Sequence, residues 1–157
     1  MHVEEIHYPD EYTYEKRCTE LDYALITVTE DLSEYVQFDI GNAYNITNSE
    51  MGTIPLHVTG RPLSFGDDVG TNETLYTHHG SVYGTDNNSL LKYTIDTSNG
   101  QSGSPVYTIT RERYNNTDYY TYTALAVHTT GSTSYNKGTL MTQYQLQFYG
   151  NNPNTTP

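Results

Sequence analysis

Short apolar runs bounded by turn residues recur along the whole chain of 157 residues. Within a run, apolar residues either alternate with polar ones or are nearly continuous, and Gly, Asn, Asp or Pro stands at most of the ends. This pattern is typical of β-strands and not of amphipathic helices. It predicts strands at residues 3–8, 23–29, 54–59, 74–83, 90–95, 105–110, 119–128 and 138–142. With no crossover helices between them, the strands favour an all-β sandwich or barrel.

Several stretches make this prediction more specific. Residues 23–29 are nearly continuous in apolar side chains, which predicts a buried strand entered directly from Asp22. Residues 30–51 are acidic and polar, so we expect a long connection there that contains no more than a short turn. Gly80 is expected to interrupt the strand in which it lies.

The second half of the chain predicts a hairpin and leaves one element open. Asn115-Asn116 is typical of the exposed tip of a β-hairpin. Residues 144–149 fit either a strand or a short terminal helix, and periodicity does not decide between them. Residues 150–157 are expected to be disordered.

Composition and charge exclude several classes of function. Apolar residues make up only 34% of the chain, but its 17 Tyr residues argue against disorder, since disordered chains are poor in aromatic residues. The net charge of −12 argues against nucleic acid and anionic membrane surfaces as partners, because both are bound through clustered cations. No apolar run approaches the ~20 residues of a membrane span. Residues 1–5 lack the layout of a signal peptide, so any export signal is expected upstream.

Cys18 is the single cysteine and cannot form a disulfide within the chain. It is either a lone thiol or the partner of a cysteine on another segment. Five Asn-x-Ser/Thr sequons begin at Asn45, Asn72, Asn87, Asn115 and Asn154. Chance explains most of these sequons in a chain rich in Asn and Thr, so they give an extracellular setting only weak support.

The densest group of turn residues places Gly100 and Gly103 on either side of Ser102. Two glycines allow a tight turn with unusual φ angles, and such a turn can aim consecutive N–H groups at one point. An oxyanion hole needs that arrangement, with Ser102 beside it as a nucleophile. The alternative is an ordinary Gly/Ser turn of a β-hairpin. The Gly-x-Ser-x-Gly elbow of α/β-hydrolases does not fit, because Ser104 replaces the second glycine and Pro105 opens a strand instead of a helix.

Residues 100–106 (Gly-Gln-Ser-Gly-Ser-Pro-Val) resemble the active-serine motif of chymotrypsin-fold serine endopeptidases, in the form found in glutamyl endopeptidases. Further segments resemble the same family in the same chain order. They are the aspartate strand at 21–26, the apolar-Gly-x-Pro segment at 56–62, the pocket strand at 126–131 and the turn at 136–139. The resemblance covers nearly the whole chain, with Arg61 in place of the usual aromatic residue. It implies a chymotrypsin-like antiparallel β-barrel.

The resemblance also implies roles for individual residues. Ser102 would attack the substrate, Asp22 would orient the catalytic histidine, and the N–H groups of Gly100 and Ser102 would form the oxyanion hole. Asp22 has a second interpretation, because acidic residues at strand starts are common in so acidic a chain. Glutamyl endopeptidases bind the substrate carboxylate through a threonine five residues before the serine and a histidine on the pocket strand. These positions are Thr97 and His128 here.

A preference for cutting after Glu or Asp is chemically plausible at these two positions. A hydroxyl and an imidazole can both donate hydrogen bonds to a carboxylate, but the net charge of −12 opposes acidic substrates, so the local pocket must supply the preference. Each residue also has a structural alternative. Thr97 would bond within its own turn, and His128 would be a half-buried strand residue.

The catalytic histidine of the family lies upstream of the aspartate in a Thr-x-x-His segment, which this chain lacks. Only His2 and His7 precede the aspartate, and His7 lies in a segment that resembles the connection between those two catalytic residues. His57, His78 and His79 follow the aspartate, contrary to the family order. Adjacent strand residues face opposite ways, so the neighbouring pair is not expected to bind a metal.

The chain is therefore expected to be a fragment of a secreted serine endopeptidase that acts on polypeptides without a metal or organic cofactor. Residues 1–50 would be a remnant of the first barrel with the aspartate strand, 51–150 a complete second barrel, and 151–157 a disordered tail. The missing N-terminal barrel would supply the histidine and a partner for Cys18. Without it we expect no useful peptidase activity, and association of the chain through the unpaired edges of its first two strands.

Two other interpretations stay open. The chain would be a short homologue that kept the second barrel as a binding module, although such a module does not need the serine turn. Alternatively, its richness in Tyr, Thr and Asn would reflect an unrelated extracellular β-sandwich or adhesion module. The β-sandwich interpretation predicts that Asp22 and Ser102 lie far apart, whereas a peptidase brings both to one cleft.

Overall fold

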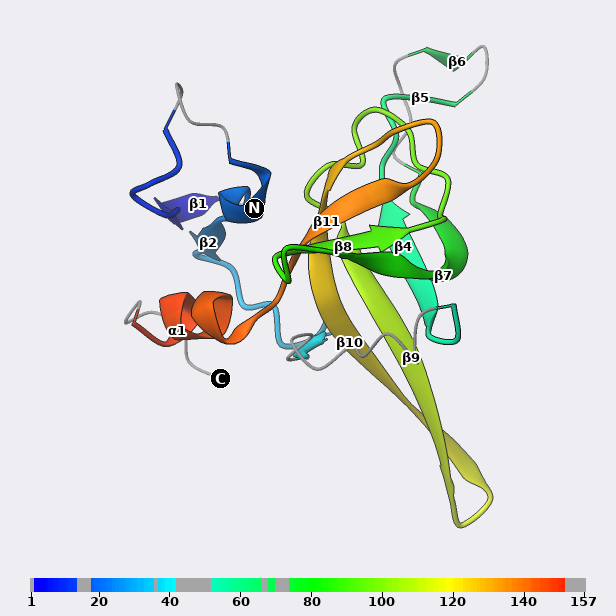
Figure 1. The fold of residues 1–157 in the computed structure, drawn as a ribbon. Coiled ribbons are helices and arrows are strands. Elements are labelled where there is room, and N and C mark those ends of the chain that lie inside the picture. The colour runs from blue at the N-terminus through cyan, green and yellow to red at the C-terminus, as the bar shows by residue number, and fades with distance from the viewer. Residues whose placement is uncertain are drawn as a thin grey trace.

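The computed structural model describes residues 2–13, 18–35, 37–41, 52–65, 68–69 and 74–151. Six strands of this part close into a ring in which every pairing is antiparallel (Figure 1). In ring order the strands are β4 (Pro55–Gly60), β7 (Tyr76–Asp86), β8 (Leu90–Tyr93), β11 (Asn136–Leu140), β10 (Thr117–Thr130) and β9 (Pro105–Tyr114), which pairs again with β4. The all-β prediction is confirmed, and the ring is compatible with a chymotrypsin-like β-barrel.

Alternating residues of the ring strands fill the interior of the barrel. In β4, for example, Leu56 and Val58 are fully buried while their neighbours are more exposed. The barrel therefore has a hydrophobic core of its own. Burial of each large aliphatic side chain in it stabilises the fold by about 1.5–3 kcal/mol. The buried residues of this core are Leu56, Val58, Val82, Leu91, Tyr93, Ile95, Val106, Leu125, Ala126 and Leu140.

The first strands form a separate sheet. Strand β1 (Val3–His7) pairs antiparallel with β2 (Leu25–Val28), and the 3-10 helix η1 (Thr19–Leu21) precedes β2. The prediction of a buried strand at 23–29 is wrong, because the strand is shorter and Ile26 is 54% exposed. Within the described residues β2 has one neighbouring strand only, which leaves the side chain of Ile26 about half exposed.

Strand β7 continues through Gly80, which corrects the expected interruption. The glycine serves a close approach instead, since an added Cβ would lie 2.8 Å from Cγ1 of Ile95 and 3.2 Å from the backbone of Thr94. The irregularity of β7 comes further along, between Val82 and Gly84, where the register with β8 shifts.

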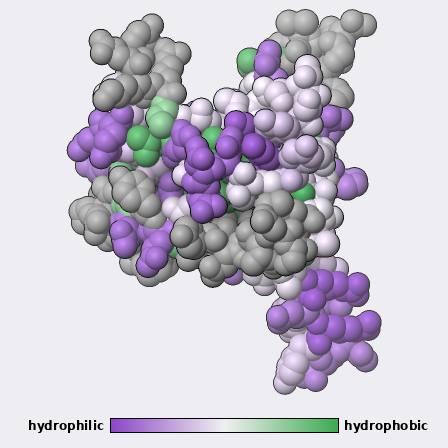
Figure 2. Space-filling model, viewed as in Figure 1, coloured by the Kyte–Doolittle hydropathy of each residue, from purple (hydrophilic) through white to green (hydrophobic). Residues whose placement is uncertain are grey.

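Strands β9 and β10 extend beyond the barrel as a long hairpin, and the predicted tip at Asn115-Asn116 is confirmed. Both Asn residues have positive φ angles, 47° and 62°, as a two-residue hairpin turn requires. The two strands are longer than predicted, because they extend into residues 111–118, between the predicted strands at 105–110 and 119–128. Figure 2 shows the end of this hairpin as a hydrophilic projection away from the body of the molecule.

Some elements were not predicted or were left open. The predicted connection at 30–51 contains β3 (Asp39–Ile40), which pairs parallel with β10, while residues 36 and 42–51 lie outside the described residues. Strands β5 (Ser64–Phe65) and β6 (Asp68–Val69) form a small sheet.

The last described element is the helix α1 (Gln143–Asn151), which decides between strand and helix for residues 144–149. Its Phe148 packs edge-on against Tyr23, with ring centroids 5.4 Å apart. Gly150 and Asn151 belong to the helix, and the rest of the predicted tail, 152–157, lies outside the described residues. No helix in the described part is both long and apolar enough to cross a membrane.

Candidate active site

The turn before β9 has the backbone conformation that its glycines allow. Gly100 and Gly103 adopt φ angles of 95° and 86°, a region that other residues rarely enter. The N–H of Gly103 donates to the carbonyl of His128 at 2.8 Å, which ties the turn to β10. Among the described residues, the N–H groups of Gly100 and Ser102 donate to no other group. These are the two N–H groups that would form an oxyanion hole according to the family resemblance.

Asp22 follows η1 as its C-terminal cap, and β2 begins only at Leu25. The expectation that Asp22 leads directly into the strand is therefore wrong. The buried hydroxyl of Thr139, in β11, donates to the carbonyl of Thr19 at 2.7 Å and lies 3.4 Å from the carbonyl oxygen of Asp22. The next residue, Tyr23, is buried against α1. The aspartate segment is thus attached to the barrel on one side and to the helix on the other.

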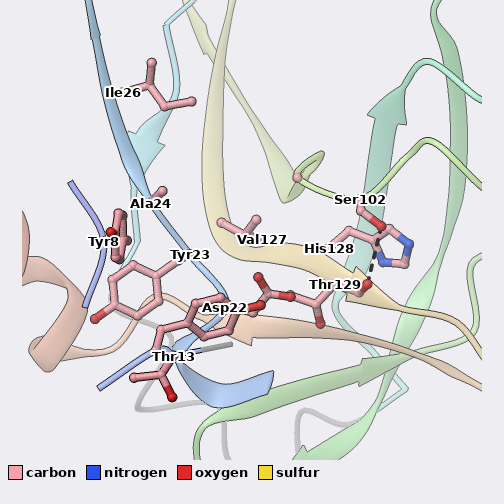
Figure 3. Close-up of a pocket in the computed structure, with 12 residues that line it drawn as sticks. Tyr8, Thr13, Asp22, Tyr23, Ala24, Ile26, Ser102, Val127, His128 and Thr129 are labelled. Carbon is pink, nitrogen blue, oxygen red and sulfur yellow. Dashed lines mark hydrogen bonds between the residues drawn. The ribbon is translucent and has the colours of Figure 1, made fainter. Parts of the chain in front are cut away.

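Asp22 and Ser102 line the same cavity, which has a volume of about 820 Å³. The walls come from the β1–β2 sheet and its flanks on one side and from the serine turn and β10 on the other. Figure 3 shows the segment 127–129 of β10 between the two residues. The β-sandwich interpretation predicts that they lie far apart, and the structure does not support it.

The hydroxyl of Ser102 has no base among the described residues. Its side chain is exposed and donates to the carbonyl of Thr129 at 3.4 Å, near the upper limit for a hydrogen bond (Figure 3). Of the six histidines in the sequence, His128 alone lines this cavity. His7 lines another cavity, and its Nε2 lies 3.0 Å from Oε2 of Glu5.

His128 is nearly completely buried, which sets its electrostatics. Its Nδ1 lies 2.5 Å from the hydroxyl oxygen of Tyr93, and that oxygen lies 3.2 Å from the carbonyl oxygen of Lys137, so the single phenol hydrogen is donated to one of these two groups at a time. Burial lowers the pKa of His128, and the Lys137 carbonyl partly opposes this shift. Burial raises the pKa of Tyr93, so its phenol stays protonated. The expectation of a half-buried His128 therefore understates its burial.

Thr97 lies near Gly131, and Gly131 belongs to the loop after β10. A Cβ at Gly131 would lie 3.8 Å from the Thr97 hydroxyl and 2.9 Å from Oδ1 of Asn136, so the glycine keeps this space open. Asn136 joins the two sides, because its Nδ2 donates to the carbonyl of Ile95 at 2.5 Å and its Oδ1 accepts from the N–H of Ser132 at 3.1 Å. The Thr97 hydroxyl itself forms no hydrogen bond among the described residues.

The remaining histidines lie on strands of the barrel. His57 and His79 are cross-strand partners, and their ring centroids are 6.3 Å apart. His78 pairs with Val58 and therefore faces the opposite way from His79, as expected. Burial and His79 lower the pKa of His57. In the part of the chain that the structure describes, no three His, Cys, Asp or Glu side chains gather into a group that could hold a metal ion.

Cys18 is exposed, and its thiol donates to Oε2 of Glu20 at 2.9 Å. This bond raises the pKa of the Cys18 thiol and lowers that of the Glu20 carboxyl. An exposed thiol is consistent with both interpretations of Cys18, a lone thiol and the partner of a cysteine on another segment.

A closed antiparallel barrel with a serine turn and an aspartate at one cavity is compatible with the chymotrypsin-like class of serine peptidase. Over 128 residues, 80% of its length, the chain is 35% identical to a glutamyl endopeptidase of Bacillus licheniformis. Over 64 residues, 39% of its length, it is 44% identical to an extracellular metalloprotease of Bacillus subtilis strain 168. No family model matches.

The chain is therefore distantly related to glutamyl endopeptidase, which is a protease. It spans 37% of the length of that curated relative and 18% of the length of the second.

Sequence reasoning missed the residues that hold the site together. Tyr93 and Asn136 were not singled out, because a lone Tyr or Asn in a strand has no signal in its own neighbourhood. Tyr8, Tyr12 and Tyr23, which line the cavity with Asp22, were missed for the same reason. The abundance of Tyr in a chain of low apolar content is the only sequence signal that could have directed attention to them.

Proposed function

We propose that this chain is the part of a secreted serine endopeptidase that carries the nucleophile and the aspartate. The observation that carries the proposal is the cavity that Asp22 and Ser102 both line, together with two N–H groups of the serine turn that donate to no described residue. The distant relation to glutamyl endopeptidase supports the same reaction. The name of the second relative, an extracellular protease, supports a location outside the cell.

In the proposed reaction the Ser102 hydroxyl attacks the carbonyl carbon of a peptide bond while an imidazole removes its proton. The N–H groups of Gly100 and Ser102 bind the developing oxyanion. The imidazolium then protonates the leaving amine, and water hydrolyses the acyl-enzyme by the same route. Asp22 orients the imidazole and stabilises its charged form. The cavity of about 820 Å³ that both residues line has the volume to admit an imidazole ring.

The histidine must come from outside the described residues, since no described histidine other than the buried His128 lines the cavity. We propose that residues 1–50 belong with a first barrel that supplies it, and that residues 51–150 form the second barrel. Residues 151–157 would be the tail. In this arrangement the chain alone has no useful peptidase activity.

The proposed substrates are polypeptides with Glu or Asp before the cleaved bond. Two residues support this choice. The hydroxyl of Thr97 has no partner among the described residues, and His128 presents an imidazole on the strand next to the serine turn. A hydrogen bond to a partly desolvated carboxylate contributes about 1.5–3 kcal/mol, enough to favour Glu over Gln roughly tenfold or more.

The test compares the 157-residue chain with the same chain extended by its upstream reading frame. A fluorophosphonate probe should label Ser102 in the extended protein and leave the 157-residue chain unlabelled. Ser102→Ala should abolish labelling, and Asp22→Asn should slow it by orders of magnitude. Ser134→Ala, at an exposed serine away from the cavity, is the matched control and should label normally. Rapid labelling of the 157-residue chain would contradict the proposal that the base lies outside it.

A non-catalytic homologue is the second candidate. The absence of a base for Ser102 among the described residues favours it. It predicts that neither protein is labelled, although both are folded.

A further inference from the structure

A buried histidine–tyrosine pair joins three strands of the barrel next to the serine turn. His128 of β10 and Tyr93 of β8 are 3% and 0% exposed, and Nδ1 of the imidazole lies 2.5 Å from the phenol oxygen. The same hydroxyl lies 3.2 Å from the carbonyl oxygen of Lys137 in β11. Because β11 pairs with both β8 and β10, the backbone fixes the three groups relative to one another.

The chemistry of this pair determines what His128 can offer to a ligand. With Nδ1 engaged by Tyr93, Nε2 is the nitrogen that is left. A carboxylate only accepts hydrogen bonds, so Nε2 must carry a hydrogen to bind one. In the neutral ring this requires Nδ1 to be the acceptor. The phenol has one hydrogen, so it enforces that tautomer when it donates to Nδ1, at 2.5 Å, and not to the Lys137 carbonyl, at 3.2 Å. The carbonyl then keeps the Thr129 hydroxyl as a donor, at 3.3 Å. The other tautomer would turn a lone pair toward the carboxylate.

The Tyr93 hydroxyl also suits the charged ring. If the ring gains a proton from a bound acid or the solvent, Nδ1–H donates to the phenol oxygen. The phenol then donates its own hydrogen to the carbonyl of Lys137, 3.2 Å away. Nε2 carries a hydrogen in this state as well, while Nδ1, the phenol and the carbonyl of Lys137 stay hydrogen-bonded to one another. A phenylalanine in the same place could do neither.

We propose that Tyr93 is the positioning residue that makes His128 a hydrogen-bond donor toward the acidic side chain of the substrate. This inference rests on the proposed function, in which His128 binds that carboxylate. Tyr93 acts through His128 and does not touch the substrate. The hydroxyl group of Tyr93 should therefore contribute to the discrimination between Glu and Gln while leaving the binding of the rest of the peptide unchanged.

The first experiment measures the tautomer directly in the unchanged 157-residue chain. Long-range proton–nitrogen NMR spectra of the ¹⁵N-labelled protein separate the two neutral tautomers of each histidine. At pH 8, where the ring is neutral, we expect His128 to carry its hydrogen on Nε2. A hydrogen on Nδ1 would overturn the inference, and this measurement requires no variant.

The second experiment removes the hydroxyl. We compare Tyr93→Phe with Tyr107→Phe, a matched control at a buried tyrosine whose phenol bonds to Thr59. The probes are two peptides that differ only in a last residue of Glu or Gln, and their dissociation constants are measured by NMR titration. We expect the unchanged chain and the control to prefer Glu roughly tenfold or more. Tyr93→Phe should reduce this ratio to about twofold or less and shift His128 toward the Nδ1–H tautomer.

The outcomes separate the two proposals. If the unchanged chain does not prefer Glu, the acidic specificity in the proposed function fails, and the inference fails with it. If the unchanged chain prefers Glu and Tyr93→Phe retains both the preference and the Nε2–H tautomer, only the role of Tyr93 is refuted. An equal loss of preference in Tyr107→Phe would mean that the effect is general loosening of the barrel, which also refutes it.

Discussion

Replacing Asn136 by alanine should destabilise the barrel through two backbone groups that it leaves without partners. The Asn136 side chain is buried and bonds to the carbonyl of Ile95 at 2.5 Å and to the N–H of Ser132 at 3.1 Å. A buried hydrogen bond contributes about 0.5–1.5 kcal/mol, and an orphaned buried group costs about 1–3 kcal/mol. Ile95 is buried, so its carbonyl is expected to incur much of this penalty. We expect a loss of about 2–4 kcal/mol in the free energy of unfolding.

The assay is urea unfolding followed by tyrosine fluorescence, because the chain has 17 Tyr and no Trp. Asn99→Ala, at an exposed turn residue, is the control and should change the free energy by no more than about 0.5 kcal/mol. Asn136→Asp should be no better than alanine, since it removes the donor to Ile95 and places a carboxylate against that carbonyl. A loss below about 0.5 kcal/mol for Asn136→Ala would refute the argument that this side chain stabilises the barrel by joining Ile95 to the loop after β10.

Three further predictions test the core, the exposed sheet and the buried histidine. Leu56→Ala should cost about 2–5 kcal/mol in urea unfolding, and a cost near zero would contradict its place in the core. Replacing both Ile6 and Ile26 by Lys should reduce association of the chain in light scattering, and unchanged association would show that this face is not the cause. Burial lowers the pKa of His128 and of His57 in the folded state, so the unfolded state binds more protons just below the usual pKa of histidine. Stability should therefore fall as the pH drops from about 7 to 5, and His128→Gln should flatten this dependence; an unchanged slope would contradict it.

The strands of the barrel could be predicted from the sequence because each carries its own signal. In β4, buried Leu56 and Val58 alternate with residues that are more exposed, and this pattern is local. The turn at Asn115-Asn116 is local as well, since asparagine tolerates the positive φ angles that both residues adopt. Ser102 stood out for the same reason, between two glycines with φ angles that favour glycine.

What could not be predicted depends on contacts between distant segments. Residues 23–29 have the composition of a buried strand, but a strand is buried only where other elements pack around it. Within the described residues β2 pairs with β1 alone. Tyr93 and His128 are 35 residues apart, and only the closure of the barrel through β11 brings them together. Asn136 reaches Ile95 in the same way, across 41 residues. A single sequence contains no pattern that links such positions.

The exposed face of the β1–β2 sheet and the incomplete cavity are two aspects of one structural feature. Ile6 and Ile26 are direct cross-strand partners, 56% and 54% exposed, and Ile26 also lines the cavity that contains Asp22 and Ser102. An apolar pair of this kind is normally covered by a neighbouring element. The proposed histidine must approach the same cavity, so a segment that delivers it would pass next to Ile26 and cover the pair. The proposal thus requires one neighbour to do both, and a catalytically complete protein in which Ile6 and Ile26 stay as exposed as they are here would contradict it.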